Sequence, residues 1–286
     1  MDSSLDLGTV TIDWLCGGNF RLDGGTMYGA VPKVLWQKKC PADANNYVKI
    51  PNAPLLVRTP GFSCIIDSGL GNKLTPKQKD IFLVYQDWDI PAELARFGLQ
   101  CSDIDMVILT HCDFDHAGGI VMHDDQYRSQ LTFPNARHII QQKEWEDVLK
   151  PNIRSVHAYW PENFSGLAHS HLLHLVNEEE QLNPHIRVSR TGGHTRGHQL
   201  VEIIGSEQRA VHFGDLLPSH THSNPLWISS YDNFPLDSVE QKERLFKHYR
   251  EQNYFFTFYH DSLMQACRLD ENGKAIDVHT CKKLRV

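Results

Sequence analysis

The chain has 286 residues, of which 41% are hydrophobic and 22% charged, so it can bury a substantial core and is neither disordered nor fibrous. Its formal net charge of −7 disfavours nucleic acid and anionic membrane surfaces as partners, because both attract basic proteins. No apolar run approaches the roughly 20 residues that a membrane-spanning helix needs.

The cysteines and the first residues bear on the cellular compartment. Seven scattered cysteines without a CxxC pair are typical of free thiols in a reducing environment. The segment MDSSLDLGTV is acidic and has no apolar centre, so we expect no signal peptide and predict a cytoplasmic protein. The cysteines are Cys16, Cys40, Cys64, Cys101, Cys112, Cys267 and Cys281.

The first third of the chain predicts strands separated by turns. Short β-rich runs at residues 10–16, 53–58 and 62–66 are bounded by glycine, proline and asparagine. Between the first two lies RLDGGTMYGAVPKVLW (21–36), where glycine and aromatic residues predict a shaped loop rather than regular structure.

The rest of the chain alternates helical and strand patterns. The run DMVILT (105–110) is almost wholly apolar, which indicates a strand buried on both faces. Residues 151–184 are hard to assign, and we expect them to cap the domain. This mixture, without a linker or a short repeat, predicts one layered α/β domain over residues 1–286. Further helices are predicted at 91–97, 142–150 and 238–251, and further strands at 137–141, 186–190, 199–204, 210–213 and 254–258.

The strongest chemical signal follows the buried strand, in the sequence THCDFDHAGG. Alternate residues at the end of a strand point to the same side, so His111 and Asp113 can converge on one metal ion. Asp115 and His116 lie on the turn that follows and can face a second ion. Taken alone, the motif fits a polar turn with two surface histidines as well as it fits a metal site.

Three later motifs strengthen the metal interpretation. GHTRGH contains His194 at the start of a predicted strand, FGD places Asp215 after another, and YHD places His260 after a third. Strands of one sheet deliver such residues to a common edge, where α/β folds tend to place their sites.

In this order and spacing, LTHCDFDHAGG, GHTRGH, FGD and YHD resemble the motifs of the metallo-β-lactamase superfamily. The segment IIDSG, with Asp67, resembles the early motif whose aspartate supports the site. The resemblance runs from about residue 10 to 265. It implies a four-layer αββα sandwich and two divalent metal ions per chain, with zinc expected and iron or manganese as alternatives.

The resemblance also implies the roles of the ligands. Asp113 stands where the family usually has histidine, and its harder oxygen donor favours iron or manganese more than imidazole does. His198 belongs to the same motif but is expected to be structural. Site one would comprise His111, Asp113 and His194, site two would comprise Asp115, His116 and His260, and Asp215 would bridge the two ions.

The function implied is a dinuclear metal-dependent hydrolase that acts on a lactone or carboxylic ester through a metal-bridging hydroxide. Acyl-homoserine lactonase-like members are the best match. Their tyrosine near the bridging aspartate is replaced here by Pro218, and we take His222, ahead of His220, as the substitute, with a surface-loop histidine as the alternative. Asp115 is assigned a catalytic role beside its role as a ligand.

Substrate contacts are assigned to Met27, Tyr28 and Trp227, for which core packing is an equally good account. The expected partner is a small-molecule substrate, with no nucleic acid and no membrane, and a homodimer is left open. Two other functions stay in view: an iron-dependent enzyme that uses oxygen, and a ligand-binding member without turnover. The histidines of GLAHSHLLH are expected to face solvent.

Overall fold

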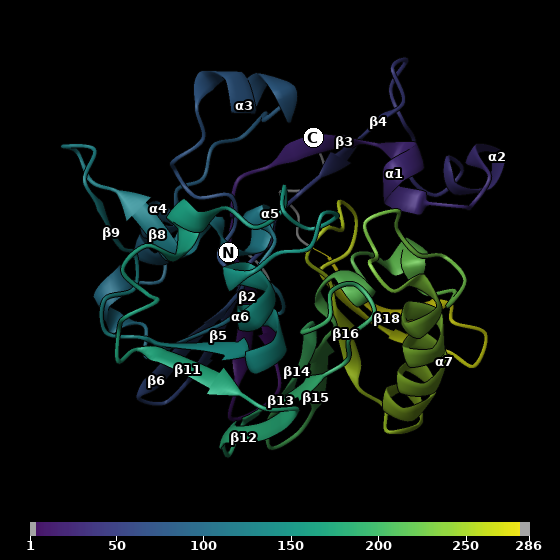
Figure 1. Ribbon diagram of the computed structural model, residues 1–286. Coiled ribbons are helices and arrows are strands. Elements are labelled where there is room, and N and C mark those ends of the chain that lie inside the picture. Colours follow the sequence, from purple (N-terminus) through teal and green to yellow (C-terminus); the bar gives the residue numbers. More distant parts are fainter. Residues whose placement is uncertain (1–3, 281–286) are drawn as a thin grey trace.

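Two seven-stranded mixed sheets form the centre of the molecule in this computed structural model, which describes residues 4–280 (Figure 1). The first sheet has the order β1 (Leu5–Asp6), β2 (Thr11–Trp14), β5 (Leu55–Thr59), β6 (Phe62–Ile66), β7 (Met106–Ile108), β10 (Arg137–Gln141) and β11 (Leu173–Val176). The second has the order β12 (Glu179–Asn183), β13 (Ile186–Arg190), β14 (Gln199–Ile204), β15 (Arg209–His212), β16 (Phe255–Thr257), β17 (Ala266–Leu269) and β18 (Ala275–His279).

Alternation along the strands creates three apolar layers. On β5 and β6, Val57 and Ile66 face the core between the two sheets, while Leu56 and Ile65 face the opposite side of the first sheet. Successive side chains of a strand point to opposite faces, so a sheet buried on both sides needs apolar residues at nearly every position. The sheets are therefore the two inner layers of a sandwich.

Helices provide the outer layers. On the first sheet, α6 (Gln142–Leu149) contacts β10 and β11. On the second, α7 (Pro235–Glu251) packs Phe246 and Tyr249 against Phe213. The fold is thus the predicted αββα sandwich. The remaining α-helices are α1 (Gly24–Tyr28), α2 (Lys33–Trp36), α3 (Pro76–Ile81), α4 (Ile90–Ala95) and α5 (Phe114–Ala117).

One end of the sandwich is covered by an early segment (top of Figure 1). The strands β3 (Phe20–Asp23) and β4 (Tyr47–Ile50) pair there, next to α1 and α2. The prediction that residues 21–36 lack regular structure was therefore wrong. The side chain of Asp23 accepts a hydrogen bond from the Thr26 amide and caps α1, a local signal that the glycine-rich pattern concealed.

Most other predicted elements are confirmed within two or three residues, and β6, β10, β13 and β14 match their predicted ranges. The uncertain segment after α6 contains turns, then β11 and β12. The six cysteines in the described part of the chain are free, and Cys281 lies outside it. Among residues 4–280, no helix has both the length and the apolar character to cross a membrane.

Candidate metal centre and substrate cavity

Both sheets deliver polar side chains to the same end of the sandwich. His111 follows β7 of the first sheet, and the short helix α5 after it carries Asp115 and His116. From the second sheet, His194 precedes β14, Asp215 follows β15 and His260 follows β16. Since β14 runs antiparallel to β15 and β15 parallel to β16, the start of β14 and the ends of the other two strands share one edge.

Local sequence explains why α5 presents its carboxylates to the site. Asp113 is the N-cap residue of α5, yet its side chain makes no capping hydrogen bond and is left to face the two neighbouring histidines. After α5, a Cβ on Gly118 would lie 2.2 Å from the carbonyl oxygen of Leu70. Only glycine permits this close approach, which holds α5 against the loop after β6.

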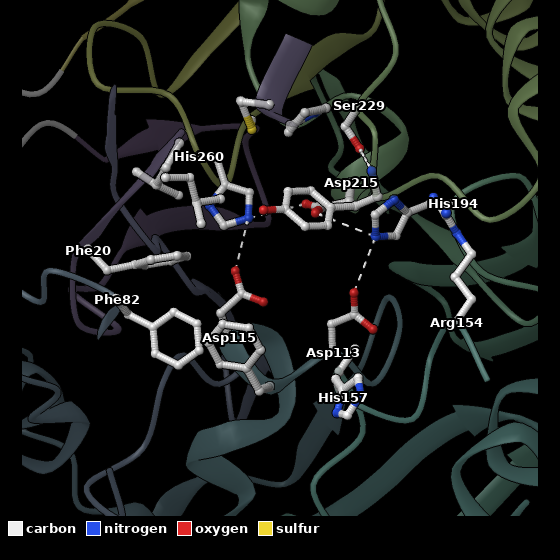
Figure 2. Close-up of a pocket in the computed structure, with 17 residues that line it drawn as sticks. Phe20, Phe82, Asp113, Asp115, Arg154, His157, His194, Asp215, Ser229 and His260 are labelled. Atoms are coloured by element: carbon white, nitrogen blue, oxygen red, sulfur yellow. Dashed lines mark hydrogen bonds and ion pairs between the residues drawn. The ribbon is translucent and has the colours of Figure 1, made fainter. Parts of the chain in front are cut away.

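The first three side chains form one compact group. Asp113 Oδ2 lies 3.7 Å from His111 Nε2 and 3.5 Å from His194 Nε2. Figure 2 shows Asp113 pointing toward His194. The three donor atoms lie within 4.8 Å of one another, a spacing at which one metal ion fits between them.

A second group lies beside the first. Asp115 Oδ2 is 3.5 Å from His260 Nε2, and His116 Nε2 is 3.2 Å from the same nitrogen. Asp215 lies between the two groups: its Oδ1 is 3.3 Å from both His116 Nε2 and His260 Nε2, and its Oδ2 is 3.6 Å from His194 Nε2. Each oxygen of Asp215 therefore faces a different group, a position from which the carboxylate can bridge two ions.

All four histidines present Nε2 inward and hold Nδ1 against an outer partner. Nδ1 of His116 lies 2.9 Å from Asp67 Oδ2, and that of His194 lies 2.8 Å from Asp232 Oδ1. The corresponding partners are Thr110 Oγ1 for His111, at 3.0 Å, and the Pro51 carbonyl for His260, at 2.8 Å. Metal-binding histidines are oriented in this way, because the outer acceptor selects the tautomer that leaves Nε2 free to ligate.

The inward atoms fit a divalent ion better than they fit one another. Nε2 of His111, Nε2 of His194 and Oδ1 of Asp215 are buried without a hydrogen-bond partner among the described residues. A buried polar atom without a partner costs free energy, so a cluster of such atoms calls for a cation at its centre. Three carboxylates and four imidazoles are ligands that zinc, iron and manganese accept. The seven predicted residues thus come together, and their binding of metal stays a prediction.

The pKa values of the histidines in the protein without metal also favour a cation at this centre. Burial disfavours a charge on His116, yet Asp215, Asp115 and Asp67 together raise its pKa well above the ordinary value. Burial, with His116 and His194 as neighbours, lowers the pKa of His111 well below it. The carboxylates therefore attract positive charge into the centre, which a proton on His116 supplies in part and a metal ion supplies fully.

Two outer carboxylates support the site, and the sequence interpretation found only one of them. Asp67 was expected from the early motif, and it also accepts a hydrogen bond from the Thr110 amide at 2.8 Å. Asp232 was missed. It is buried, bonds His194 and lies in a loop before α7. His198, expected to be structural, is buried with its Nδ1 2.6 Å from Thr191 Oγ1.

A further buried carboxylate, Glu144 on α6, was also missed. It accepts hydrogen bonds from the Cys112 amide at 2.9 Å, from Thr195 Oγ1 at 2.6 Å and from the Tyr159 hydroxyl at 3.0 Å. Burial raises the pKa of Glu144 to about 7. Glu144 thereby ties the segment after β7 to the loop before β14, and these two segments carry the three residues predicted for site one.

A cavity of about 310 Å³ opens over the two groups. Aromatic side chains, including Phe20 and Phe82, line the side next to Asp115 and His260, whereas Arg154 and His157 lie on the side of Asp113 and His194 (Figure 2). Its other lining residues are Leu22, Met27, Ile50, Phe114, Ala158, Asp215, Pro218, Ser229 and Tyr231.

Only one of the three predicted substrate contacts lines the cavity. Met27 lines the cavity, but Tyr28 and Trp227 do not. Tyr28 is buried in a stack between Trp36 and His222, and Trp227 packs edge-on against it. For these two residues core packing, the alternative account, is the correct one.

The assignment of His222 as a catalytic group also requires correction. Its side chain is fully buried and does not line the cavity. Nε2 donates to the Met27 carbonyl at 3.1 Å and Nδ1 lies 2.8 Å from Ser219 Oγ, so both ring nitrogens have partners. The nearby His220 is held by Asp261 and likewise lies outside this cavity. Of the two expected catalytic residues, only Asp115 faces the cavity.

Comparison with known proteins identifies the class. The profile of the metallo-beta-lactamase superfamily matches residues 51–247, about two thirds of the chain, and the protein belongs to that superfamily. Probable metallo-hydrolases of Mycobacterium bovis and Mycobacterium tuberculosis are 27% identical over 177 residues. This match covers 56% of the chain and 55% of each relative, so it spans just over half of their length.

Solved structures extend the likeness over almost the whole chain. A probable metal-dependent hydrolase from Staphylococcus aureus is 38% identical, covers 98% of this chain and 99% of its own, and superposes with a TM-score of 0.92. The dizinc quorum-quenching lactonase AidC, solved with the product N-hexanoyl-L-homoserine, is 19% identical over 98% of this chain and 97% of its own, with a TM-score of 0.76. At that identity AidC shows a shared fold.

Proposed function

We propose that this protein is a dinuclear metal-dependent hydrolase that acts on a lactone or carboxylic ester. The observation that carries the proposal is the bridging position of Asp215 between two groups of inward-facing donors. Superfamily membership, the metal-dependent hydrolase of Staphylococcus aureus and the dizinc lactonase AidC support it. When bound, the two ions would polarise the acyl carbonyl and lower the pKa of water.

The reaction itself is simple to balance. Water adds its oxygen to the acyl carbon, the bond from that carbon to the ester oxygen breaks, and a carboxylate, an alcohol and a proton result. Asp115 faces the cavity, and burial raises the pKa of its carboxyl group. Asp115 would take the proton of the attacking water, because its carboxylate lies at the metal centre and faces the cavity.

Gently purified protein is expected to contain two divalent ions per chain and, assayed with that metal, to hydrolyse members of a panel of lactones and carboxylic esters. Three carboxylates converge in the site, and leaving them without balancing charge is costly. Elemental analysis counts and identifies the ions. One ion in a fully loaded sample, or two ions without turnover of any lactone or ester, would contradict the proposal.

We assign to Tyr231 the role predicted from the sequence for His222, which is to donate a hydrogen bond to the developing oxyanion. It lines the cavity, and burial raises the pKa of its hydroxyl, so the proton stays in place at neutral pH. That hydroxyl donates to Thr26 Oγ1 at 3.1 Å and can rotate toward a ligand. Tyr231→Phe should lower kcat by about 10²-fold, as loss of one oxyanion donor does, with metal content unchanged.

The exposed Tyr127 provides the matched control, since Tyr127→Phe removes the same atom from a residue that does not line the cavity. If both variants retain the wild-type kcat, the oxyanion donor is not Tyr231.

The alternative function, oxygen-dependent chemistry at iron, is favoured by one feature. Asp113 places a carboxylate oxygen within 3.7 Å of two histidine nitrogens, and this harder donor favours iron or manganese more than a third imidazole would. Oxygen uptake by protein that contains iron, without hydrolysis of any ester, would select this function.

A further inference from the structure

The substrate cavity is chemically two-sided. Phe20, Phe82 and Phe114 form a wall of contacting rings, with Phe82 and Phe114 stacked at 4.7 Å between centroids. Figure 2 shows Phe20 and Phe82 on the side of His260, and Arg154 on the side of His194. A molecule that spans the metal centre therefore meets an apolar wall at one end and a guanidinium at the other.

Arg154 is fixed in place by the loop before α7. Its Nε donates to Asn233 Oδ1 at 2.9 Å, and its Nη2 donates to the carbonyl oxygens of Ser230 and, at 3.2 Å, Asp232. These bonds hold a side chain that otherwise loses much conformational entropy on binding a ligand. The guanidinium is thus oriented before a substrate arrives.

The same guanidinium lacks a partner for its charge. Nη1 makes no hydrogen bond to any described residue, and no described carboxylate lies within ion-pair distance of Arg154. Among the described residues that line the cavity, Arg154 alone carries a permanent positive charge. A fixed arginine with a free nitrogen is suited to a carboxylate, because the hydrogen bond is assisted by charge.

The net charge of the loaded metal centre explains why Arg154 would govern the binding of an anionic group. Two divalent ions, a hydroxide and the three aspartates of the centre sum to zero, so the loaded centre exerts no net attraction on an anion. A single guanidinium balances a single negative charge. A phosphate group with two negative charges would keep one of them unbalanced, which favours a carboxylate over a phosphate.

We propose that Arg154 determines specificity by binding a free carboxylate of the substrate, so that the substrate is a lactone or ester with an apolar part and a separate carboxylate. This inference rests on the proposed function for the position of the scissile bond. The apolar part lies against the aromatic wall, the scissile carbonyl lies at the metal centre, and the free carboxylate accepts a hydrogen bond from Arg154 Nη1.

The experiment compares two esters that differ only in charge: monophenyl adipate and the analogue whose free carboxyl is a primary amide. The wild type should prefer the carboxylate in kcat/KM. Arg154→Met should lower kcat/KM for the carboxylate about 10- to 100-fold, the range of a charge-assisted hydrogen bond, and change the amide less than about threefold. Arg154→Lys should restore part of the preference, and metal content should be unchanged.

Asn233→Ala is the graded control, because it removes one anchor of Arg154 and leaves the charge. It should lower kcat/KM for the carboxylate ester by a smaller factor than Arg154→Met does, and change the amide less than about threefold. An equal loss on both esters in Arg154→Met would mean that Arg154 only secures the loop that carries Asp232, and would overturn the proposal.

A binding measurement separates this proposal from the proposed function. Calorimetry on metal-loaded protein should show that 4-phenylbutyrate binds at least about tenfold more tightly to the wild type than to Arg154→Met, while 4-phenylbutyramide does not distinguish them. This result would support the carboxylate site even if no ester is hydrolysed. Equal binding of 4-phenylbutyrate to both proteins would mean that it binds the metal alone, and would refute the role of Arg154.

Discussion

Asp215→Ala is expected to abolish binding of both metal ions and to lower activity by about 10³-fold or more, since the polarisation that the ions supply is worth several kcal/mol and each 1.36 kcal/mol is a factor of ten. The physical reason is position. One oxygen of Asp215 faces His116 and His260 at 3.3 Å, and the other faces His194 at 3.6 Å. Removing the carboxylate deprives both groups of a ligand. Elemental analysis and kcat measure the two effects.

His194→Ala provides the comparison, because His194 lies in one group only. This variant should lose mainly one ion per chain and retain the other. If the two variants lose the same number of ions in a titration with metal, Asp215 is not a bridge and the division of the seven residues into two sites is wrong.

The second large effect concerns stability in acid. Burial lowers the pKa of His138, on β10, to about 4, whereas a histidine in an unfolded chain has a pKa of about 6.5. Between these values the unfolded state binds a proton that the folded state does not, so the free energy of unfolding falls as pH falls from about 6.5 to about 4. The difference between these two pKa values corresponds to about 3 kcal/mol in the free energy of unfolding. This contribution is fully present above about pH 6.5 and is lost below about pH 4.

His138→Leu should remove that part of the pH dependence, which urea unfolding at pH 7 and pH 4.5 measures as a difference between variant and wild type. His169 is exposed, so His169→Leu is the matched control and should leave the pH dependence as it is. An equal loss of stability between pH 7 and pH 4.5 in wild type and His138→Leu would show that His138 does not contribute.

The residues at the site are of two kinds. Some belong to a sequence motif, and others come to the site only through the tertiary structure. Asp113, Asp115 and His194 were identified because each lies within two residues of another candidate ligand or of a glycine, near a point where a predicted strand begins or ends. Asp232 and Arg154 have no such neighbours, and they reach the site only because the loop before α7 folds back over it. Neither the end of a predicted strand nor a neighbouring candidate ligand marks them in the sequence.

The error at His222 has the same origin. In the sequence it is a polar residue four positions beyond Pro218, close to the bridging Asp215, and nothing local distinguishes a side chain that faces a cavity from one that faces away. In the structure it stacks on Tyr28 at 4.8 Å between centroids, and Tyr28 comes from a distant part of the chain. The cavity instead receives Tyr231.

By itself, the sequence determined nine of the strands (β2, β5–β7, β10 and β13–β16), the two main helices and the seven residues that converge, because alternation of apolar residues and the ends of strands are local properties. The tertiary structure decided which side chains form the wall of the cavity. Phe20 on β3, Phe82 after α3, Arg154 after α6 and Tyr231 before α7 are far apart in the chain. Their meeting depends on how loops pack over the end of the sandwich, and packing between distant segments leaves no periodic signal in a single sequence.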